Sequence, residues 1–297
     1  MNEKTRRFLL KWFERFDRRS MLSVLSDTMY LKLLFRLKFD KALNLNTPQT
    51  FNEKLQYLKL YDRKPIYTQM VDKYSVKEYV SDIIGSEYII PTLGIWDSFD
   101  DIDFDTLPEK FVLKCTHDSG GLVICRDKSK LDKEAARKKI EKSLKTNYYW
   151  RGREWPYKNV PARIMAEAYM QDGDNESLPV YKFFCFGGRA CIIQTIQNDK
   201  TPDETIDYFD REWTLLDLKQ NFPNSLNPLV KPNLFDKMLE IADVLAKVKK
   251  NFIRVDLYYI NGKIYFSEFT FFSDSGMAVF HPEHWDERLG EMIDLSL

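Results

Sequence analysis

The chain has 297 residues, of which 44% are hydrophobic, so it is long enough to bury a sizeable core in one large or two to three small domains. Lys plus Arg and Asp plus Glu balance at 45 each, which leaves no overall electrostatic attraction to nucleic acid. The four cysteines lack metal-ligand spacing, and we find neither a signal peptide nor an apolar run of membrane-spanning length. We therefore expect a cytoplasmic protein with reduced thiols.

Residues 1–41 are locally basic, with eleven Lys or Arg against five acids, and they carry apolar residues at helical spacing, namely Phe8, Leu9, Trp12, Phe13 and Phe16. This pattern predicts an amphipathic helix. We favour a helix docked on its own domain, because docked helices are far commoner than interfacial ones. The alternative is peripheral contact of residues 1–20 with an anionic membrane surface, which would suit an enzyme acting on a lipid-linked glycan.

Two helices are predicted next. Thr50 is followed three residues later by Glu53, the pattern of a capping box, so a helix is expected to begin there. The spacing predicts a second helix over 66–84, with Gly85 placed to end it. Residues 89–96 are expected to form a strand, and the acidic stretch 97–109 reads as a solvated connection between domains.

A hairpin with a small polar loop follows. The predicted strands cover 111–115 and 122–125, and the loop between them contains Ser119, Gly120 and Gly121. Backbone N–H groups of such a loop can approach phosphate oxygens closely, and Lys114 would reach a phosphate as a point charge. Most loops of this composition are ordinary hairpin turns, so the motif alone decides nothing.

The middle of the chain alternates helix and strand. We expect a charged helix over 129–146 and a strand over 163–170 that contains Glu167. In between, residues 147–158 set aromatic side chains beside cations, which suits either a sugar-like acceptor or structural packing. A hairpin over 181–186 and 190–197 and an amphipathic helix over 232–248 complete this part.

The stretch 251–276 predicts a second hairpin, because two strands of alternating polarity flank Asn261-Gly262. We expect a three-residue loop, which pairs Tyr259 with Lys263 and sets Arg254 opposite Glu268. An odd loop brings Asp256 and Glu268 to one face, whereas a two-residue turn would separate them.

The residues on that face suggest phosphoryl transfer. Two carboxylates, Asp256 and Glu268, beside the hydroxyl of Thr270 suit Mg²⁺, and the neighbouring Arg254 suits a phosphate that the metal also contacts. The structural alternative is a solvated hairpin face with a cross-strand ion pair.

The order of these motifs resembles the ATP-grasp superfamily. More narrowly, the segments TPQTFNEKLQYLKLYDR, DKYSVKEYV, FVLKCTHDSGG and YKFFCFGG resemble its TupA-like branch, found among proteins of bacterial surface-polysaccharide assembly. The resemblance runs from about Asn46 to near the C-terminus.

The resemblance implies roles for particular residues. Lys73 and Lys114 match the phosphate-binding lysines, Ser119, Gly120 and Gly121 the flap, and Glu167 the adenine-site acid. The backbone of Ala168, Tyr169 and Met170 would contact adenine. Asp256, Glu268 and Thr270 match the metal site, where Thr270 replaces the usual asparagine, and Arg254, with Lys114, would act on the transferring phosphate. The role of Lys182 stays open.

The fold and activity implied are those of the superfamily. We expect an α+β, ATP-grasp fold in which two lobes with antiparallel sheets clasp ATP: a basic helical segment (1–45), an α/β region (46–107), a small lobe with the flap (108–170) and a large lobe with the metal site (171–297). The activity expected is a carboxylate-amine ligase using ATP and Mg²⁺ on a uronic acid or amino acid of a capsule or O-antigen. A glycosyltransferase, a phosphotransferase and a non-catalytic binding module remain as alternatives. The identity of the acceptor and the oligomeric state are not specified by the sequence.

Overall fold

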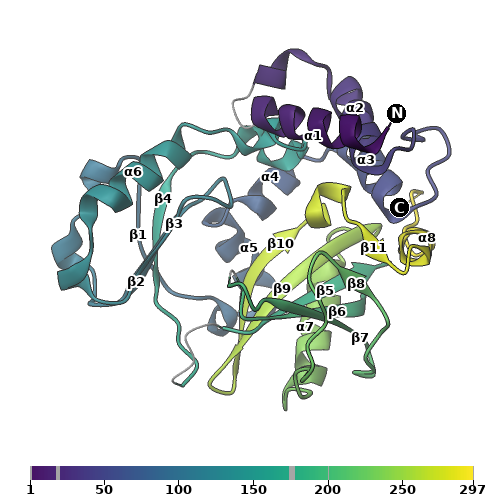
Figure 1. Cartoon of the computed structure of the whole chain (residues 1–297). Coiled ribbons are helices and arrows are strands. Elements are labelled where there is room, and N and C mark those ends of the chain that lie inside the picture. The colour runs from purple at the N-terminus through teal and green to yellow at the C-terminus, as the bar shows by residue number, and fades with distance from the viewer. Residues whose placement is uncertain (1, 18–20, 174–177, 200, 297) are drawn as a thin grey trace.

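Two antiparallel sheets face each other across the centre of the molecule (Figure 1). The computed structural model describes residues 2–17, 21–173, 178–199 and 201–296. We call the four-stranded sheet with its covering helix the small lobe, and the five-stranded sheet with its helices the large lobe. The expectation of two α+β lobes with antiparallel sheets is confirmed.

The small lobe has the strand order β1-β4-β2-β3 and consists of β1 (Thr92–Trp96), β2 (Phe111–Cys115), β3 (Leu122–Cys125) and β4 (Ile164–Ala168). Helix α6 (Lys133–Leu144) covers one face of this sheet (Figure 1). Phe111 and Leu113 point from β2 toward that helix and are fully buried, as is Ile140 of α6. The other face, which carries Lys114, is therefore turned toward the large lobe.

The large lobe has the strand order β10-β9-β5-β6-β7, with β5 (Val180–Phe186), β6 (Arg189–Gln197), β7 (Thr205–Asp210), β9 (Phe252–Ile260) and β10 (Lys263–Thr270). Helix α7 (Phe235–Ala246) packs on its outer face and buries Met238, Ile241 and Leu245. A small sheet of β8 (Lys219–Gln220) and β11 (Phe280–His281) and helix α8 (His284–Glu291) complete the lobe.

Helices α3 (Phe51–Tyr61), α4 (Ile66–Val71) and α5 (Ser75–Ile84) precede the first strand. Thr50 caps α3 in a capping box with Glu53, and Gly85 ends α5, as predicted. The single helix predicted over 66–84 is wrong, because the chain breaks at residues 72–74, where the Asp72 carboxylate accepts a hydrogen bond from the Tyr74 N–H at 3.0 Å. The break releases Lys73 from the helix.

The expected separate region 46–107 has no core of its own. Phe51 and Leu55 of α3 belong to the core of the large lobe, together with Phe252 and Phe280. Phe99, Ile102 and Phe104 belong instead to the core of the small lobe. The segment is therefore shared between the two lobes rather than forming an independent unit.

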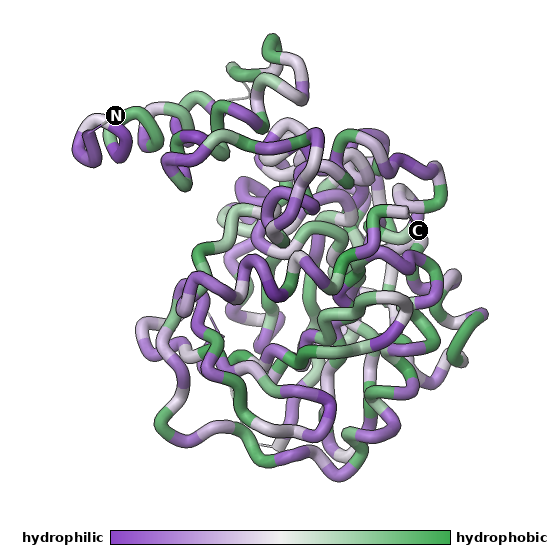
Figure 2. The backbone as a smooth tube through the Cα atoms, turned by 90° about the vertical axis from the view of Figure 1, so that its right-hand side faces the viewer, coloured by the Kyte–Doolittle hydropathy of each residue, from purple (hydrophilic) through white to green (hydrophobic). Residues whose placement is uncertain are grey.

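The N-terminal segment forms a pair of helices, α1 (Glu3–Asp17) and α2 (Asp27–Phe39), at the top of the molecule in Figure 1. Phe13 of α1 packs against Tyr30 of α2 with ring centroids 5.2 Å apart. Figure 2 shows this pair projecting beyond the body of the protein. No helix within the described ranges combines the length and the apolarity needed to cross a membrane.

Candidate functional site

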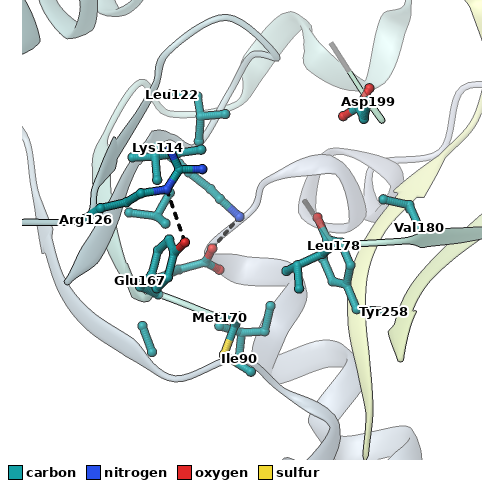
Figure 3. Close-up of a pocket in the computed structure, with 14 residues that line it drawn as sticks. Ile90, Lys114, Leu122, Arg126, Glu167, Met170, Leu178, Val180, Asp199 and Tyr258 are labelled. Carbon is teal, nitrogen blue, oxygen red and sulfur yellow. Dashed lines mark hydrogen bonds and ion pairs between the residues drawn. The ribbon is translucent and has the colours of Figure 1, made fainter. Parts of the chain in front are cut away.

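A cavity of about 350 Å³ lies between the two lobes (Figure 3). Its walls are mainly apolar and come from both sheets and from the segment that joins them, including Ile90, Val112, Leu122, Ile124, Met170, Leu178, Val180 and Tyr258. Ala168, Tyr169 and Met170, the residues expected to contact adenine, line it. The size and apolar character suit a flat heterocycle held between two sheets.

One wall of the cavity is charged. The Glu167 carboxylate is 5% exposed and pairs with Lys114 through one oxygen and with Lys77 through the other, at 2.6 Å from the Lys77 Nζ. Burial by itself would raise the pKa of Glu167, but the two lysines lower it. The resemblance implied only an adenine-site role for Glu167, whereas the structure shows a carboxylate that holds Lys114 in place.

Lys77 was not among the predicted site residues. Its Nζ also donates to the Ile90 carbonyl at 2.7 Å. The residue lies on α5, four positions after Lys73. No local pattern distinguishes it from an exposed helical lysine. The signal lies only in tertiary contact, because the Lys77 side chain on α5 reaches the Glu167 carboxylate on β4.

The predicted flap is the loop that connects β2 and β3. Lys73, which the helix break brings to this loop, donates from its backbone N–H to the Thr116 carbonyl at 3.1 Å and from its Nζ to the Asp118 carbonyl. Gly121 is buried, and a Cβ there would lie 2.4 Å from the Cys115 sulfur. Ser119 and Gly120 are exposed at the tip.

The hairpin of β9 and β10 has a different register from the one predicted. Ile260 pairs with Lys263, so the loop has two residues, Asn261 and Gly262, both with positive φ (48° and 74°). The predicted three-residue loop is wrong. A shift in the pairing between Phe266 and Glu268 restores the parity instead, because Ser267 forms a β-bulge.

The bulge sets the two carboxylates side by side. Glu268 is directly opposite Asp256, and Thr270 is opposite Arg254, so the predicted pairing of Arg254 with Glu268 is also wrong. The sequence does contain the signal for the bulge. Phe266 and Phe269 are three residues apart, so regular alternation would place them on opposite faces, whereas their ring centroids lie 5.0 Å apart.

Arg254 is buried and organises this face of β9 and β10. Its Nε and Nη2 donate to the two oxygens of Asp256, both at 2.7 Å, and Nη2 also donates to the Thr270 hydroxyl at 2.9 Å. Nη1 donates to the Ser273 hydroxyl at 3.2 Å. Arg254 and Asp256 are 7% and 1% exposed, so the solvated cross-strand pair considered above is excluded.

Glu268 lies where the charges of both lobes meet. Among the described residues it makes no direct ion pair. Burial by itself would raise the pKa of its carboxyl group, but the positive charges nearby lower the pKa, and these belong to Lys73, Arg254, Lys182 and Lys114. Lys182 is next to Asp256 in the adjacent strand β5. Glu268 is thus held ionised, and in the described part of the chain no cationic side chain pairs directly with its oxygens.

This arrangement fits one divalent cation bridged to a phosphate better than a cage built by protein alone. Within the described residues there is no group of three or more His, Cys, Asp or Glu side chains that could hold a metal ion. Glu268 has an ionised carboxylate to offer, while both oxygens of Asp256 accept hydrogen bonds from Arg254. Mg²⁺ commonly uses one or two carboxylates and completes its shell with phosphate and water.

The aromatic segment after α6 is packed in the protein interior. Arg153 is fully buried, with its guanidinium 4.4 Å from the Tyr30 ring centroid and 4.7 Å from that of Trp150. Of the two interpretations of this segment, structural packing therefore accounts for Arg153. Tyr148 contacts Ser119 at the tip of the flap, and the charge of Glu154, burial and the charge of Glu268 raise its pKa.

A family model described as TupA-like ATPgrasp matches residues 53–294. Among solved structures, an L-amino acid ligase from Bacillus licheniformis is 14% identical (TM-score 0.48; 89% of this chain and 58% of that chain covered). A D-alanine-D-alanine ligase from Helicobacter pylori is 12% identical (TM-score 0.46; 82% and 67% covered).

A further structure, a D-alanine-D-alanine ligase from Bacillus anthracis complexed with ATP, is 16% identical (TM-score 0.40), with 68% of this chain covered. The chain spans about half of that ligase, 53% of its length. A search of curated proteins found no match. Because the family model covers most of the sequence, the expected ATP-grasp fold is confirmed, and the chain belongs to the TupA-like ATP-grasp family.

Proposed function

We propose that this protein is an ATP-dependent carboxylate-amine ligase that forms an amide through an acylphosphate. One observation carries the proposal: Lys114 lines the apolar cavity between the lobes, and its charge acts, together with those of Lys73 and Arg254, on the Glu268 carboxylate of the large lobe. A nucleotide in this cavity would have its phosphates between cations on both sides and a carboxylate able to share a metal with them.

The small lobe would bind the nucleotide. The adenine ring fits the apolar cavity against the backbone of residues 168–170, and the side chain of Lys114, fixed by Glu167, would meet the phosphates. The N–H groups of Ser119 and Gly120 at the flap tip would close over them. Lys73 holds the flap through the Asp118 carbonyl and would bring a further positive charge to the same place.

The large lobe would perform the chemistry. Mg²⁺, held by Glu268 with Asp256 and Thr270 next to it, would withdraw electron density from the phosphate oxygens. A substrate carboxylate oxygen attacks the γ-phosphorus and ADP leaves, which gives an acylphosphate. The amine nitrogen then attacks the acyl carbon, loses a proton and expels inorganic phosphate. Arg254, oriented by Asp256, would stabilise the negative charge that develops on the transferring group.

The substrates are proposed from the family and from the charges at the site. We expect a uronic acid or an amino acid as the carboxylate partner, in the decoration of a capsule or O-antigen, because the TupA-like branch is found with surface-polysaccharide assembly. Lys182 and Arg254 supply positive charge where that carboxylate would bind. The reaction uses ATP, and we place it in the cytoplasm, where ATP is supplied.

Nucleotide choice is the first test. ATP with Mg²⁺ should raise the melting temperature by several degrees, because a ligand at about 100 times its Kd stabilises the native state by about 2.7 kcal/mol. Lys114→Met should lose most of this increase, whereas Lys138→Met, at an exposed position on α6 of the same lobe, should keep it. Stabilisation by a UDP-sugar and not by ATP at millimolar concentration would instead indicate a glycosyltransferase.

Product analysis is the second part of the test. The protein is incubated with ATP, Mg²⁺ and a panel of uronic and amino acids, and ADP release is measured with hydroxylamine present. A ligase gives a hydroxamate, since hydroxylamine intercepts the acylphosphate. A phosphotransferase gives ADP and a stable phosphorylated product without hydroxamate, and that result would refute the ligase proposal.

A further inference from the structure

Helix α1 leaves an apolar surface uncovered after it has docked. We call Phe8, Leu9 and Trp12, which are 59%, 41% and 40% exposed, the aromatic face of α1. The docked side of the helix is a different one, where Phe13 is 6% exposed against Tyr30 and Arg6 donates to the Leu37 carbonyl at 3.0 Å. The exposed side chains are thus not needed to attach α1 to the protein.

The aromatic face is bordered by positive charge. A stripe of exposed basic side chains runs along the helix next to the aromatic face. It consists of Lys4, Lys11 and Arg15, at spacings of seven and four residues. The Arg15 guanidinium lies 5.6 Å from the centroid of the Trp12 ring. Over residues 1–20 the basic residues Lys4, Arg6, Arg7, Lys11, Arg15, Arg18 and Arg19 outnumber the acids Glu3, Glu14 and Asp17, although the whole chain has no net charge.

We propose that α1 binds in the plane of an anionic phospholipid bilayer, with its aromatic face in the headgroup region and the basic stripe against the lipid phosphates. Aromatic rings favour this interface, because they bury apolar area at the depth where cationic side chains still reach phosphate. A second copy of the chain is a poorer occupant. A symmetric dimer through this face would bring the two basic stripes together. Figure 2 shows the helix projecting beyond the lobes.

Hydrogen bonds join the N-terminal helical segment to residues 149–153, next to the flap. The Arg153 Nη2 donates to the Leu22 carbonyl at 2.7 Å, the Gly152 N–H donates to the Tyr30 hydroxyl at 3.0 Å, and the Tyr149 hydroxyl donates to Asp27 at 2.6 Å. These residues belong to the same segment as Tyr148, which contacts the flap. A bilayer bound at α1 would therefore hold the site at a defined height above the lipid, where a lipid-linked acceptor could reach it.

The test is co-sedimentation of the full chain with vesicles, without nucleotide or substrate. We expect binding to vesicles of phosphatidylcholine with phosphatidylglycerol, little binding to phosphatidylcholine alone, and release at high salt. The variant Phe8→Ser/Trp12→Ser should bind at least about tenfold more weakly. The matched control is Leu226→Ser/Val230→Ser, which removes two apolar side chains of the large lobe that are 98% and 87% exposed, and it should bind like the wild type.

Several results would overturn the proposal. The proposal is wrong if the wild-type protein stays in the supernatant with anionic vesicles. It is also wrong if the Phe8→Ser/Trp12→Ser variant binds the vesicles with an affinity within twofold of that of the wild type. A dimer seen by light scattering that depends on Phe8 and Trp12, without vesicle binding, would assign the surface to a second copy instead. Circular dichroism checks that the variants are folded. ADP release with soluble substrates is measured in parallel and should not change, so failure here is distinct from failure of the ligase proposal.

Discussion

Arg254 and Asp256 form a buried pair whose structural and chemical roles can be separated. The two side chains are 7% and 1% exposed and share two hydrogen bonds of 2.7 Å. Replacing Arg254 by Met leaves Asp256 buried without its cation, which we expect to lower the free energy of unfolding by about 3–5 kcal/mol. The double variant Arg254→Met/Asp256→Asn removes both charges and should recover most of that loss.

Turnover should respond differently from stability. Both variants lack the guanidinium that would stabilise the transferring phosphoryl group, so we expect kcat to fall on the order of a hundredfold or more in each. Stability is measured by urea denaturation followed by circular dichroism, and turnover by ADP release with the substrate pair found in the panel. The double variant would then be stable but inactive.

A second bidentate pair provides the control. Arg211 contacts Asp243 through two hydrogen bonds of 2.9 Å, but the side chains are 21% and 27% exposed and lie away from the cavity. Arg211→Met should lower the free energy of unfolding by about 1 kcal/mol and leave kcat unchanged. Our reasoning is refuted if Arg254→Met loses less than about 1 kcal/mol, or if the double variant turns over near the wild-type rate.

Two further predictions concern the small lobe. The lysines lower the pKa of Glu167, so the stability that its ionised form contributes is fully present above the unfolded-state pKa of about 4.3 and is lost as pH falls through the folded-state pKa. Glu167→Gln should therefore be about 1.5–3 kcal/mol less stable than the wild type at pH 7, and this difference in stability should close below pH 4. Urea denaturation across this pH range checks the prediction, and a difference that does not depend on pH contradicts it. In Gly121→Ala the new Cβ would lie 2.4 Å from the Cys115 sulfur, so the flap must shift, with a loss of about 1–3 kcal/mol and a smaller ATP-dependent rise in melting temperature. Gly120→Ala, whose Cβ would meet nothing closer than 3.4 Å, should behave like the wild type in both assays, and equal behaviour of the two variants would contradict the flap assignment.

Local patterns in the sequence determined the elements and much of the site. The capping box of Thr50 and Glu53 and the stop at Gly85 were predicted because a helix end satisfies its free backbone groups with neighbours along the chain. The strands that carry Lys114 and Glu167 were predicted from short, mainly apolar runs, which are also a local feature of the sequence. The family resemblance then supplied the order of the motifs, and the matching family model covers them.

Tertiary structure decided how these elements meet. The choice between an odd loop and a bulge at Ser267 depends on which side chains pack together, and the rings of Phe266 and Phe269 lie 5.0 Å apart because the bulge falls between them. Lys77 and Glu167 are 90 residues apart, and their ion pair exists only because the fold brings the two side chains within reach of each other. Register, burial and ion pairing between distant segments follow from the whole core, whereas caps, turns and strand periodicity follow from a few consecutive residues.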